Sequence, residues 1–308
     1  MAKIFIDGSA GTTGLRIRER LAERKDLSLI VLSEELRKDT EARRQALNEA
    51  DIAFLCLPDA AAIEAVSLIE NPNTAVIDTS TAHRTNPAWE YGFPELQGRR
   101  EKIAASKRIA NPGCHASGFV ALVEPLVRAG VIAPDAGLTA YSLTGYSGGG
   151  KKMIAEYEDA ERDPLLDAPR MYGLGQTHKH LPEMGAVCGL STAPIFCPVV
   201  APYYAGMEVT FQLFAKDIKG RAEDICRIYE EYYQSGLVRF CGNTSEGGLL
   251  SANALEGRDD MEITVQGNAD RILLVARFDN LGKGASGAAI QNMNILLGVD
   301  ESTGLNIG

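Results

Sequence analysis

Hydrophobic residues gather in short continuous runs along the first half of the chain, and amphipathic helical patterns lie between them. Four of the runs have the length expected of strands buried on both faces of a sheet. They are residues 3–7, 28–32, 51–57 and 74–78. Alternation of strands and helices at this spacing predicts an α/β domain, with a Rossmann-type doubly wound parallel sheet and right-handed crossovers.

The hydrophobic pattern changes in the second half of the chain. Residues 137–144 alternate between apolar and polar, as expected of a strand with one buried face. Further strands are expected at 193–200, 207–214, 261–265 and 271–278, with a helix at 222–234. We therefore predict an α+β second domain with a mostly antiparallel sheet, an arrangement typical of substrate or dimerisation domains. A last helix, 285–297, is expected to pack back on the first domain.

Composition limits the classes of function. A chain of 308 residues that is 45% hydrophobic can bury sizeable cores in two domains. Its net charge of −10 argues against a nucleic-acid surface. The six cysteines include no CxxC pair, which is typical of reduced thiols in the cytosol. With no signal peptide and no run approaching 18 apolar residues, we expect a cytoplasmic protein without a membrane span.

A glycine-rich turn separates the first strand from the helix after it. Gly8, Gly11 and Gly14 have the spacing G-x-x-G-x-x-G, a variant of the dinucleotide-binding fingerprint. Such a turn lets the backbone approach a pyrophosphate and exposes the helix N–H groups to it. The cofactor contacts expected here are Gly8, Ser9, Gly11, Thr12, Thr13 and Gly14.

The end of the second strand leaves the choice of dinucleotide open. Ser33 with Arg37 and Lys38 can hold a 2′-phosphate, which favours NADP. Glu34 can instead bind the ribose hydroxyl of NAD. A solvated helix start with ordinary charges is an equally simple interpretation.

Several chemistry-bearing residues follow strands, where ligands of parallel sheets bind. They are Pro58, Ser80, Arg84 and Cys114. Cys114 comes after an Asn-Pro-Gly turn and at the start of an apolar helical run, so helix N–H groups and the macrodipole favour its thiolate. Most cysteines are small buried residues, but this position makes Cys114 our candidate nucleophile.

Two of the four histidines, His178 and His180, stand close together in the second half. A metal site is not expected, because no third ligand with suitable spacing is near. A Cys–His pair for nucleophilic catalysis is the better chemical interpretation. The glycine-rich turn at 145–152 carries Lys151, and it is interpreted either as an anion pocket or as a flexible surface turn.

A set of motifs distributed over almost the whole chain resembles one known family. The chain is similar to the short form of the N-acetyl-γ-glutamyl-phosphate reductases. These enzymes of arginine biosynthesis are relatives of aspartate-semialdehyde dehydrogenase. Each motif is weak alone, and the combination is specific. The motifs lie at 8–14, 78–84, 91–95, 111–114, 147–151, 178–183, 279–284 and 291–294.

The resemblance implies NADP(H) as cofactor, Cys114 as nucleophile and His180 or His178 as acid/base. It adds Ser33, Arg37, Pro58, Ser80 and Asn280 to the cofactor contacts. The implied substrate contacts are Arg84, Arg108, Ser147, Gly148, Lys151 and Glu183. An NADP-binding domain is expected at 1–114 with 285–308, and a catalytic and dimerisation domain at 115–284. A homo-oligomer, dimer or tetramer, is implied as well.

The implied reaction is the NADPH-dependent reductive dephosphorylation of N-acetyl-L-glutamyl 5-phosphate to the 5-semialdehyde through a Cys114 thioester. The same cysteine would serve an aspartyl or aminoadipyl phosphate, so the acyl chain stays open. Two interpretations from other classes also remain. One is a dinucleotide-binding redox sensor without catalysis, and the other is a Cys–His hydrolase that needs no nicotinamide.

Overall fold

The computed structural model describes residues 1–234 and 236–308, which form two compact units. The first unit comprises residues 1–94, 98–112 and 285–305. The second comprises residues 95–97, 113–284 and 306–308. The sequence-based boundaries fall at 114/115 and 284/285, whereas the main passages between the units lie at 112/113 and 284/285, with further ones at 94/95, 97/98 and 305/306.

The first unit is built on a six-stranded sheet in which every neighbouring pair is parallel. Its strands, in the order β2-β1-β3-β4-β6-β5, are β1 Ala2–Asp7, β2 Leu27–Ile30, β3 Ile52–Leu55, β4 Ala75–Asp78, β5 Glu90–Tyr91 and β6 Arg108–Ala110. The predicted Rossmann-type parallel sheet is confirmed. The pattern did not predict β5 and β6, because strands of two and three residues show no periodicity.

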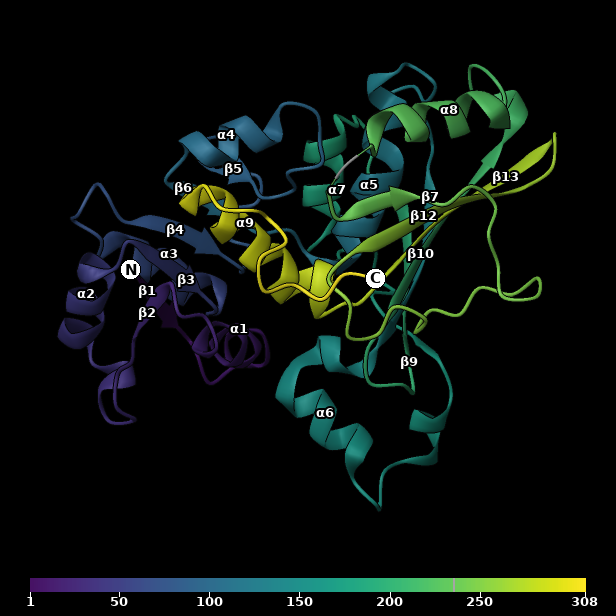
Figure 1. Ribbon diagram of the computed structural model, residues 1–308. Helices are drawn as coiled ribbons and strands as arrows, with labels where there is room; N and C mark the ends of the chain where they lie inside the picture. Colours follow the sequence, from purple (N-terminus) through teal and green to yellow (C-terminus); the bar gives the residue numbers. More distant parts are fainter. Residues whose placement is uncertain (235) are drawn as a thin grey trace. The chain divides into compact units, whose positions relative to one another are not determined.

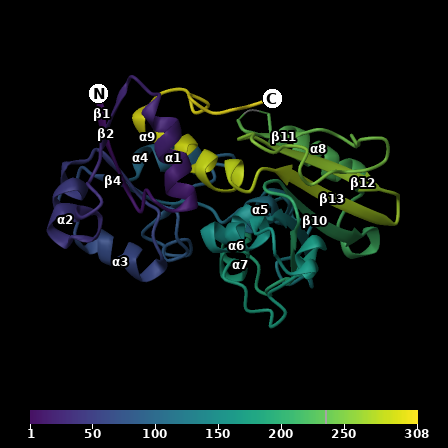
Figure 2. The same ribbon diagram turned by 90° about the horizontal axis from the view of Figure 1, so that it is seen from below.

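Helices cover both faces of this sheet (Figures 1 and 2). On one face lie α1 Thr12–Ala22, α4 Arg99–Ala105 and α9 Gly287–Leu297, which share a core with Ile4, Phe54 and Ile77. On the other lie α2 Thr40–Glu49 and α3 Asp59–Ser67, packed on Phe5 and Leu55. Asp39 caps α2, since its side chain accepts from the Ala42 N–H. The short helix η1 Leu36–Lys38 precedes it.

The second unit contains a mixed seven-stranded sheet in the order β11-β12-β13-β10-β7-β9-β8. The strands are β7 Thr139–Gly145, β8 Arg170–Met171, β9 Ile195–Ala201, β10 Met207–Phe214, β11 Val238–Phe240, β12 Met261–Gly267 and β13 Arg271–Phe278. Four of the six neighbouring pairs are antiparallel, as predicted; β7–β9 and β11–β12 are parallel. The pattern did not predict β8, because a strand of two residues shows no periodicity.

One face of this second sheet, here called the inner face, packs on α5 Cys114–Arg128. A Cβ at Gly118 of α5 would lie 2.5 Å from Val209 of β10, so glycine is needed for the helix to approach the sheet this closely. Tyr229 and Tyr233 donate to α5 carbonyls at 2.5 and 2.7 Å, which fixes α5 beneath α8. The remaining helices are α6 Gly150–Glu158, α7 Leu181–Cys188 and α8 Ala222–Tyr232, with 3-10 turns η2 Tyr146–Gly149, η3 Pro164–Asp167 and η4 Ala215–Asp217.

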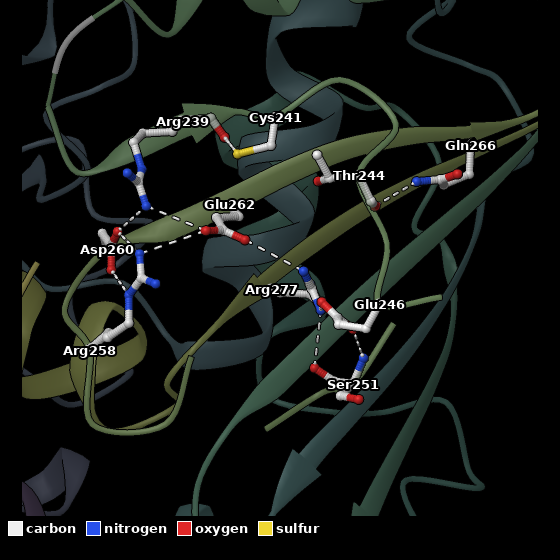
Figure 3. Close-up of polar contacts among 10 residues, drawn as sticks. All are labelled: Arg239, Cys241, Thr244, Glu246, Ser251, Arg258, Asp260, Glu262, Gln266 and Arg277. Carbon is white, nitrogen blue, oxygen red and sulfur yellow. Dashed lines mark hydrogen bonds and ion pairs between the residues drawn. The ribbon is translucent and has the colours of Figure 1, made fainter. Parts of the chain in front are cut away.

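The opposite or outer face carries a network of charges on β11, β12 and β13 (Figure 3). Asp260 accepts from Arg239 at 2.8 Å and from Arg258 at 2.5 Å. Arg277 donates to Glu246 at 2.6 Å and is only 4% exposed. These pairs hold the segment between β11 and β12 against the outer face of the sheet.

A buried ion pair stands where β13 leads back toward α9. Lys283 lies in the π-helical segment η5 Gly282–Ser286, and its Nζ is 2.7 and 2.9 Å from the two carboxylate oxygens of Glu95. Both side chains are almost completely buried. Glu95 also accepts from the Leu237 N–H at 3.2 Å. Glu95, the last residue of the 91–95 motif, therefore has a structural role in the second unit.

Candidate active site

Cys114 is the first residue of α5, with Gly113 as the N-cap. The turn is held from two sides, since Glu183 of α7 accepts from the Gly113 N–H at 2.8 Å and Ser117 donates to the Gly113 carbonyl. Glu183 is 1% exposed, so its carboxylate supports the nucleophile turn. The Cys114 side chain is partly exposed. A thiol at a helix N-terminus with solvent access is the arrangement of reactive cysteines.

Four of the five other thiols lie in less reactive surroundings. Burial raises the pKa of Cys56 to about 12 and that of Cys188 well above its usual value. Burial also raises the pKa values of Cys226 and Cys241. Because the thiolate is the reactive form, these four cysteines are poor nucleophiles near neutral pH.

Gly284 packs directly against Cys114. A Cβ at this position would lie 3.0 Å from the Cys114 Cβ and 3.1 Å from the Asp279 carbonyl oxygen. Gly284 belongs to η5, and π-helical segments are frequent at functional sites. The space behind Cys114 is therefore closed by backbone.

Three of the four histidines form a cluster beside this turn. His115 follows Cys114 in α5, and its ring centroid is 5.6 Å from those of both His178 and His180. The rings of His178 and His180 are 4.8 Å apart. The His178 Nδ1 accepts from the His180 backbone N–H at 3.2 Å, which leaves its Nε2 to carry the proton. These contacts join His178 and His180 to the residue after Cys114, whereas the Cys–His pair itself and the choice of acid/base between His178 and His180 stay predictions.

The sequence did not identify three residues that meet at this cluster, namely His115, Ser142 and Tyr172. The His115 Nδ1 is 2.7 Å from the Ser142 hydroxyl of β7, and its Nε2 is 2.6 Å from the Tyr172 hydroxyl after β8. His115 could have been predicted, because it directly follows the candidate nucleophile in the sequence. Ser142 and Tyr172 could not, because only the fold brings them to His115.

His115 predicts a pH dependence of stability. Burial, with the nearby positive groups His178 and Lys179, lowers the pKa of His115 to about 3. Between pH 6.5, near the ordinary pKa of histidine, and pH 3, His115 is protonated in the unfolded chain but stays neutral in the folded chain. The free energy of unfolding therefore decreases as the pH falls from about 6.5 toward 3. At pH 5 the loss from this group is about 2 kcal/mol. Urea unfolding at pH 7 and pH 5 should show this loss in the wild type and a smaller one in His115→Gln; equal losses would contradict it.

The predicted phosphate contacts of the second unit lie near the start of α6. The Asn280 amide donates to the Ser147 hydroxyl at 3.0 Å, and its oxygen accepts from the Gly206 N–H at 2.9 Å. Asn280 is buried, and it positions Ser147 through this contact. Its contact with the cofactor stays a prediction. Gly148 and the exposed Lys151 follow in η2 and in the first turn of α6.

The two predicted arginines differ in position. Arg84 donates to the Asn111 and Thr79 carbonyls, both at 3.0 Å, so it joins the loops that follow β6 and β4. Arg108 opens β6 and donates at 2.9 Å to the carbonyl of Thr74, the residue before β4. That is the amino edge of the sheet, opposite to the loops where ligands bind. Arg108 thus lies away from the edge of the sheet where ligands bind, and the substrate contacts expected of Arg108 and Arg84 stay predictions.

The loop after β4 has its own polar organisation, which the sequence did not reveal. Asp78 accepts from the Ser80 hydroxyl at 2.7 Å and from the Ser80 N–H at 2.9 Å, and it also contacts the His83 Nδ1 at 2.6 Å. The His83 ring stacks on Trp89 with a centroid distance of 4.0 Å. Ser80 is thereby turned toward Asp78, and its predicted cofactor contact would have to come from its oxygen lone pairs or the backbone.

A cavity of about 630 Å³ opens beside the glycine turn of the first unit. Gly8 has φ +86°, and a Cβ there would lie 2.3 Å from the Cys56 carbonyl oxygen, so only glycine fits. Of the predicted cofactor contacts, Gly8, Ser9 and Arg37 line the cavity. So do three further cations, Arg18, Lys38 and Arg43.

These residues fit a dinucleotide phosphate. The backbone turn precedes the N-terminus of α1, and the cations lie around the cavity wall. Arg37 also pairs with Glu34 at 2.5 Å, and Ser33 donates to Glu35. The predicted contacts Gly11, Thr12, Thr13 and Gly14 form the turn and first residues of α1, and Pro58 caps α3.

Comparison with known families defines the class of the protein. Residues 3–106 match the family described as "Semialdehyde dehydrogenase, NAD binding domain". Residues 114–280 match "Semialdehyde dehydrogenase, dimerisation domain". Together the matches span most of the chain, which therefore belongs to the semialdehyde dehydrogenase family.

Full-length relatives narrow the comparison. A Nostoc sp. protein named N-acetyl-gamma-glutamyl-phosphate reductase 2 is 43% identical over 324 residues, covering 98% of this chain and 99% of its own. A Brucella ovis protein named N-acetyl-gamma-glutamyl-phosphate reductase is 46% identical over 307 residues, covering 96% and 99%. The resemblance inferred from the motifs is confirmed.

Solved structures agree with the fold. Aspartate semialdehyde dehydrogenase II of Vibrio cholerae, complexed with ASA, superposes with a TM-score of 0.72 at 17% identity and covers 96% of this chain and 98% of its own. The Candida albicans enzyme with NADP gives 0.67 at 15% identity, covering 96% and 98%. At these identities the likeness shows the fold alone. No helix in the described part of the chain is long and apolar enough to cross a membrane.

Proposed function

We propose that this protein reduces N-acetyl-L-glutamyl 5-phosphate to N-acetyl-L-glutamate 5-semialdehyde with NADPH, a step of arginine biosynthesis. The observation that carries the proposal is the placement of Cys114 at the N-terminus of α5 beside a cluster of histidines. The names of the full-length relatives support the choice of substrate. The cavity beside Gly8, whose lining holds four cations and two carboxylates (Asp7 and Glu34), supports a phosphorylated dinucleotide.

In the proposed mechanism, the Cys114 thiolate attacks the acyl carbon, and a thioester forms as phosphate leaves. The nicotinamide supplies the hydride that reduces this thioester. A histidine, His178 or His180, protonates the resulting oxyanion and takes the proton back as sulfur departs. Such proton transfer contributes on the order of 10²–10⁴ in rate. Lys151, Ser147 and Arg84 are the proposed contacts for the phosphate and carboxylate groups.

The proposal is tested by phosphate-dependent oxidation of N-acetyl-glutamate semialdehyde, followed by nicotinamide absorbance with NADP and with NAD. We expect faster turnover with NADP and an absolute need for phosphate. A strong preference for aspartate or aminoadipate semialdehyde would transfer the assignment to a related acyl-phosphate reductase. Binding of NADPH without turnover of any of these semialdehydes would favour the redox sensor.

We further propose that the protein is a homo-oligomer, dimer or tetramer, formed through the outer face of the second sheet, and that it acts in the cytoplasm. Large apolar side chains stand exposed on this face. They are Tyr141 of β7, Ile195 of β9, Phe214 of β10 and Leu273 of β13. An apolar sheet face of this kind is typical of an interface, and the family description names a dimerisation domain in this region.

Light scattering tests the interface. Leu273→Glu places a charge on the outer face, so it is expected to lower the molar mass in solution from that of a dimer or tetramer toward 33.1 kDa. Ile63→Glu is the matched control, because Ile63 is an exposed apolar residue of α3 in the first unit. A wild-type mass of one chain, or an unchanged mass for Leu273→Glu, would refute this interface.

A further inference from the structure

A chain of three polar side chains lies behind the nucleophile. His115, the residue after Cys114, is 2% exposed, and Ser142 on the inner face of β7 is fully buried. Tyr172 is held beside β9, since its N–H donates to the Pro198 carbonyl at 3.0 Å. Distances of 2.7 and 2.6 Å join Ser142 to His115 and His115 to Tyr172. Three separate segments therefore meet at one imidazole.

The imidazole of His115 is neutral at the pH where enzymes work. Its surroundings hold it so: Phe196 packs edge-on at 5.3 Å, and the titratable groups that face it are Tyr172, His178, His180 and Lys179. Burial and the cations lower its pKa to about 3. A neutral imidazole has one N–H and one lone pair. Since both ring nitrogens contact hydroxyl groups, one of them donates and the other accepts.

The Ser142 hydroxyl decides which nitrogen carries the proton. Within the described residues, the hydrogen-bond partner of this fully buried hydroxyl is His115 Nδ1 and no other group. A proton on Nδ1 would leave the Ser142 hydroxyl proton without an acceptor, which is costly for a buried donor. Ser142 therefore donates to Nδ1, the proton sits on Nε2, and Nε2–H donates to the Tyr172 oxygen. The hydroxyl proton of Tyr172 is then directed away from His115.

We propose that His115 is a positioning residue, which presents the hydroxyl of Tyr172 as a hydrogen-bond donor to Cys114 and to the acyl oxygen bound there. Tyr172 lies beside the nucleophile turn, because its hydroxyl is 2.6 Å from His115, the residue after Cys114, and its ring centroid is 5.7 Å from that of His178. Burial raises the pKa of Tyr172, and the negative charge of Cys114 raises it further. A raised pKa keeps the phenol protonated, as a donor must be. The hydrogen bond from Tyr172 stabilises the thiolate before attack and the oxyanion afterwards. Tyr172 transfers no proton in either step. The inference rests on the proposed role of Cys114 as nucleophile.

Two conservative variants separate this role from simple packing. In His115→Gln the amide reaches the position of Nε2, so it can still donate to Tyr172. In His115→Asn the amide reaches the position of Nδ1, so it can contact Ser142 and loses Tyr172. Tyr172→Phe removes the donor itself. Tyr229→Phe is the matched control, since the Tyr229 hydroxyl is also buried and bonded, but to the Leu122 carbonyl of α5.

The first readout is the rate of Cys114 alkylation by iodoacetamide between pH 5 and 10, followed on the Cys114 peptide. The second is kcat and KM for the semialdehyde. His115→Asn and Tyr172→Phe are expected to move the thiol titration up by about one unit and to lower kcat about ten- to a hundredfold, with KM within about twofold. His115→Gln should recover most of both properties, and Tyr229→Phe should change neither titration nor kcat. The double variant His115→Asn/Tyr172→Phe should be no worse than Tyr172→Phe.

Three outcomes overturn the proposal. One is a titration of Tyr172→Phe that matches the wild type, and this decides the matter even if His115→Asn fails to fold. Another is equal loss in His115→Gln and His115→Asn, which would indicate packing. The third is a double variant whose losses multiply. Alkylation needs no substrate, so these outcomes are distinct from a failure of the proposed reaction, which the semialdehyde assay alone reports.

Discussion

Cys114→Ser is expected to abolish turnover, with a loss of about 10⁴-fold or more in kcat. The serine hydroxyl occupies the same site at the start of α5, but it is not ionised there at neutral pH and is a far weaker nucleophile than a thiolate. Binding of NADPH should be unchanged, because the cavity beside Gly8 is built from residues of the first unit. Fluorescence titration with NADPH and the semialdehyde assay measure the two properties separately.

Cys226→Ser is the matched control for this experiment. Cys226 lies on α8 and its pKa is raised by burial, so its replacement should leave turnover near that of the wild type. A Cys114→Ser variant that retains more than about a hundredth of the wild-type kcat would contradict the thioester mechanism. Loss of NADPH binding in the same variant would indicate damage to the fold.

Lys283→Met is expected to lower the free energy of unfolding by about 3–5 kcal/mol. The substitution leaves the Glu95 carboxylate buried without its cation, and a buried unpaired charge is strongly destabilising. The second unit should be affected, because both residues belong to it. Urea unfolding, monitored by circular dichroism and with the slope compared to that of the wild type, measures the change.

Two further variants give this prediction its controls. In Lys283→Met/Glu95→Gln no buried charge remains, and the glutamine oxygen can still accept from the Leu237 N–H, so most of the lost stability should return. Arg162→Met breaks the exposed pair with Asp167 and should cost less than about 1 kcal/mol. If Lys283→Met costs no more than Arg162→Met, the buried pair does not have the proposed importance.

The sequence predicted those strands and helices that are long enough to show a hydrophobic pattern. Strands such as Ile52–Leu55 and Met207–Phe214 have continuous or alternating apolar runs, and both sheets follow from them. Arg170–Met171 and Glu90–Tyr91 are strands because the neighbours β9 and β6 supply hydrogen bonds. Tertiary pairing of this kind leaves no local signal.

The candidate site also contains features that the sequence predicted and features that only the fold creates. Cys114 was predictable, because the Asn-Pro-Gly turn and the helix that follows are local features of the sequence. The ligand contacts expected of Asn280 and Arg108 stay predictions, since a motif shows which residue stands at a position and not where its side chain bonds, and both side chains bond within the protein. The partners of His115 come from positions 27 and 57 residues away, which only the folded chain brings together.

The raised pKa values of four thiols have a practical consequence. Burial favours the protonated forms of Cys56, Cys188, Cys226 and Cys241, whereas Cys114 stands at a helix start, which favours its thiolate. A limiting dose of a mild electrophile is therefore expected to label Cys114 before these four thiols. Cys197 is also partly exposed, so its peptide is the one to follow beside that of Cys114. The same order of reactivity predicts that peroxide, which oxidises accessible thiolates first, lowers turnover through Cys114.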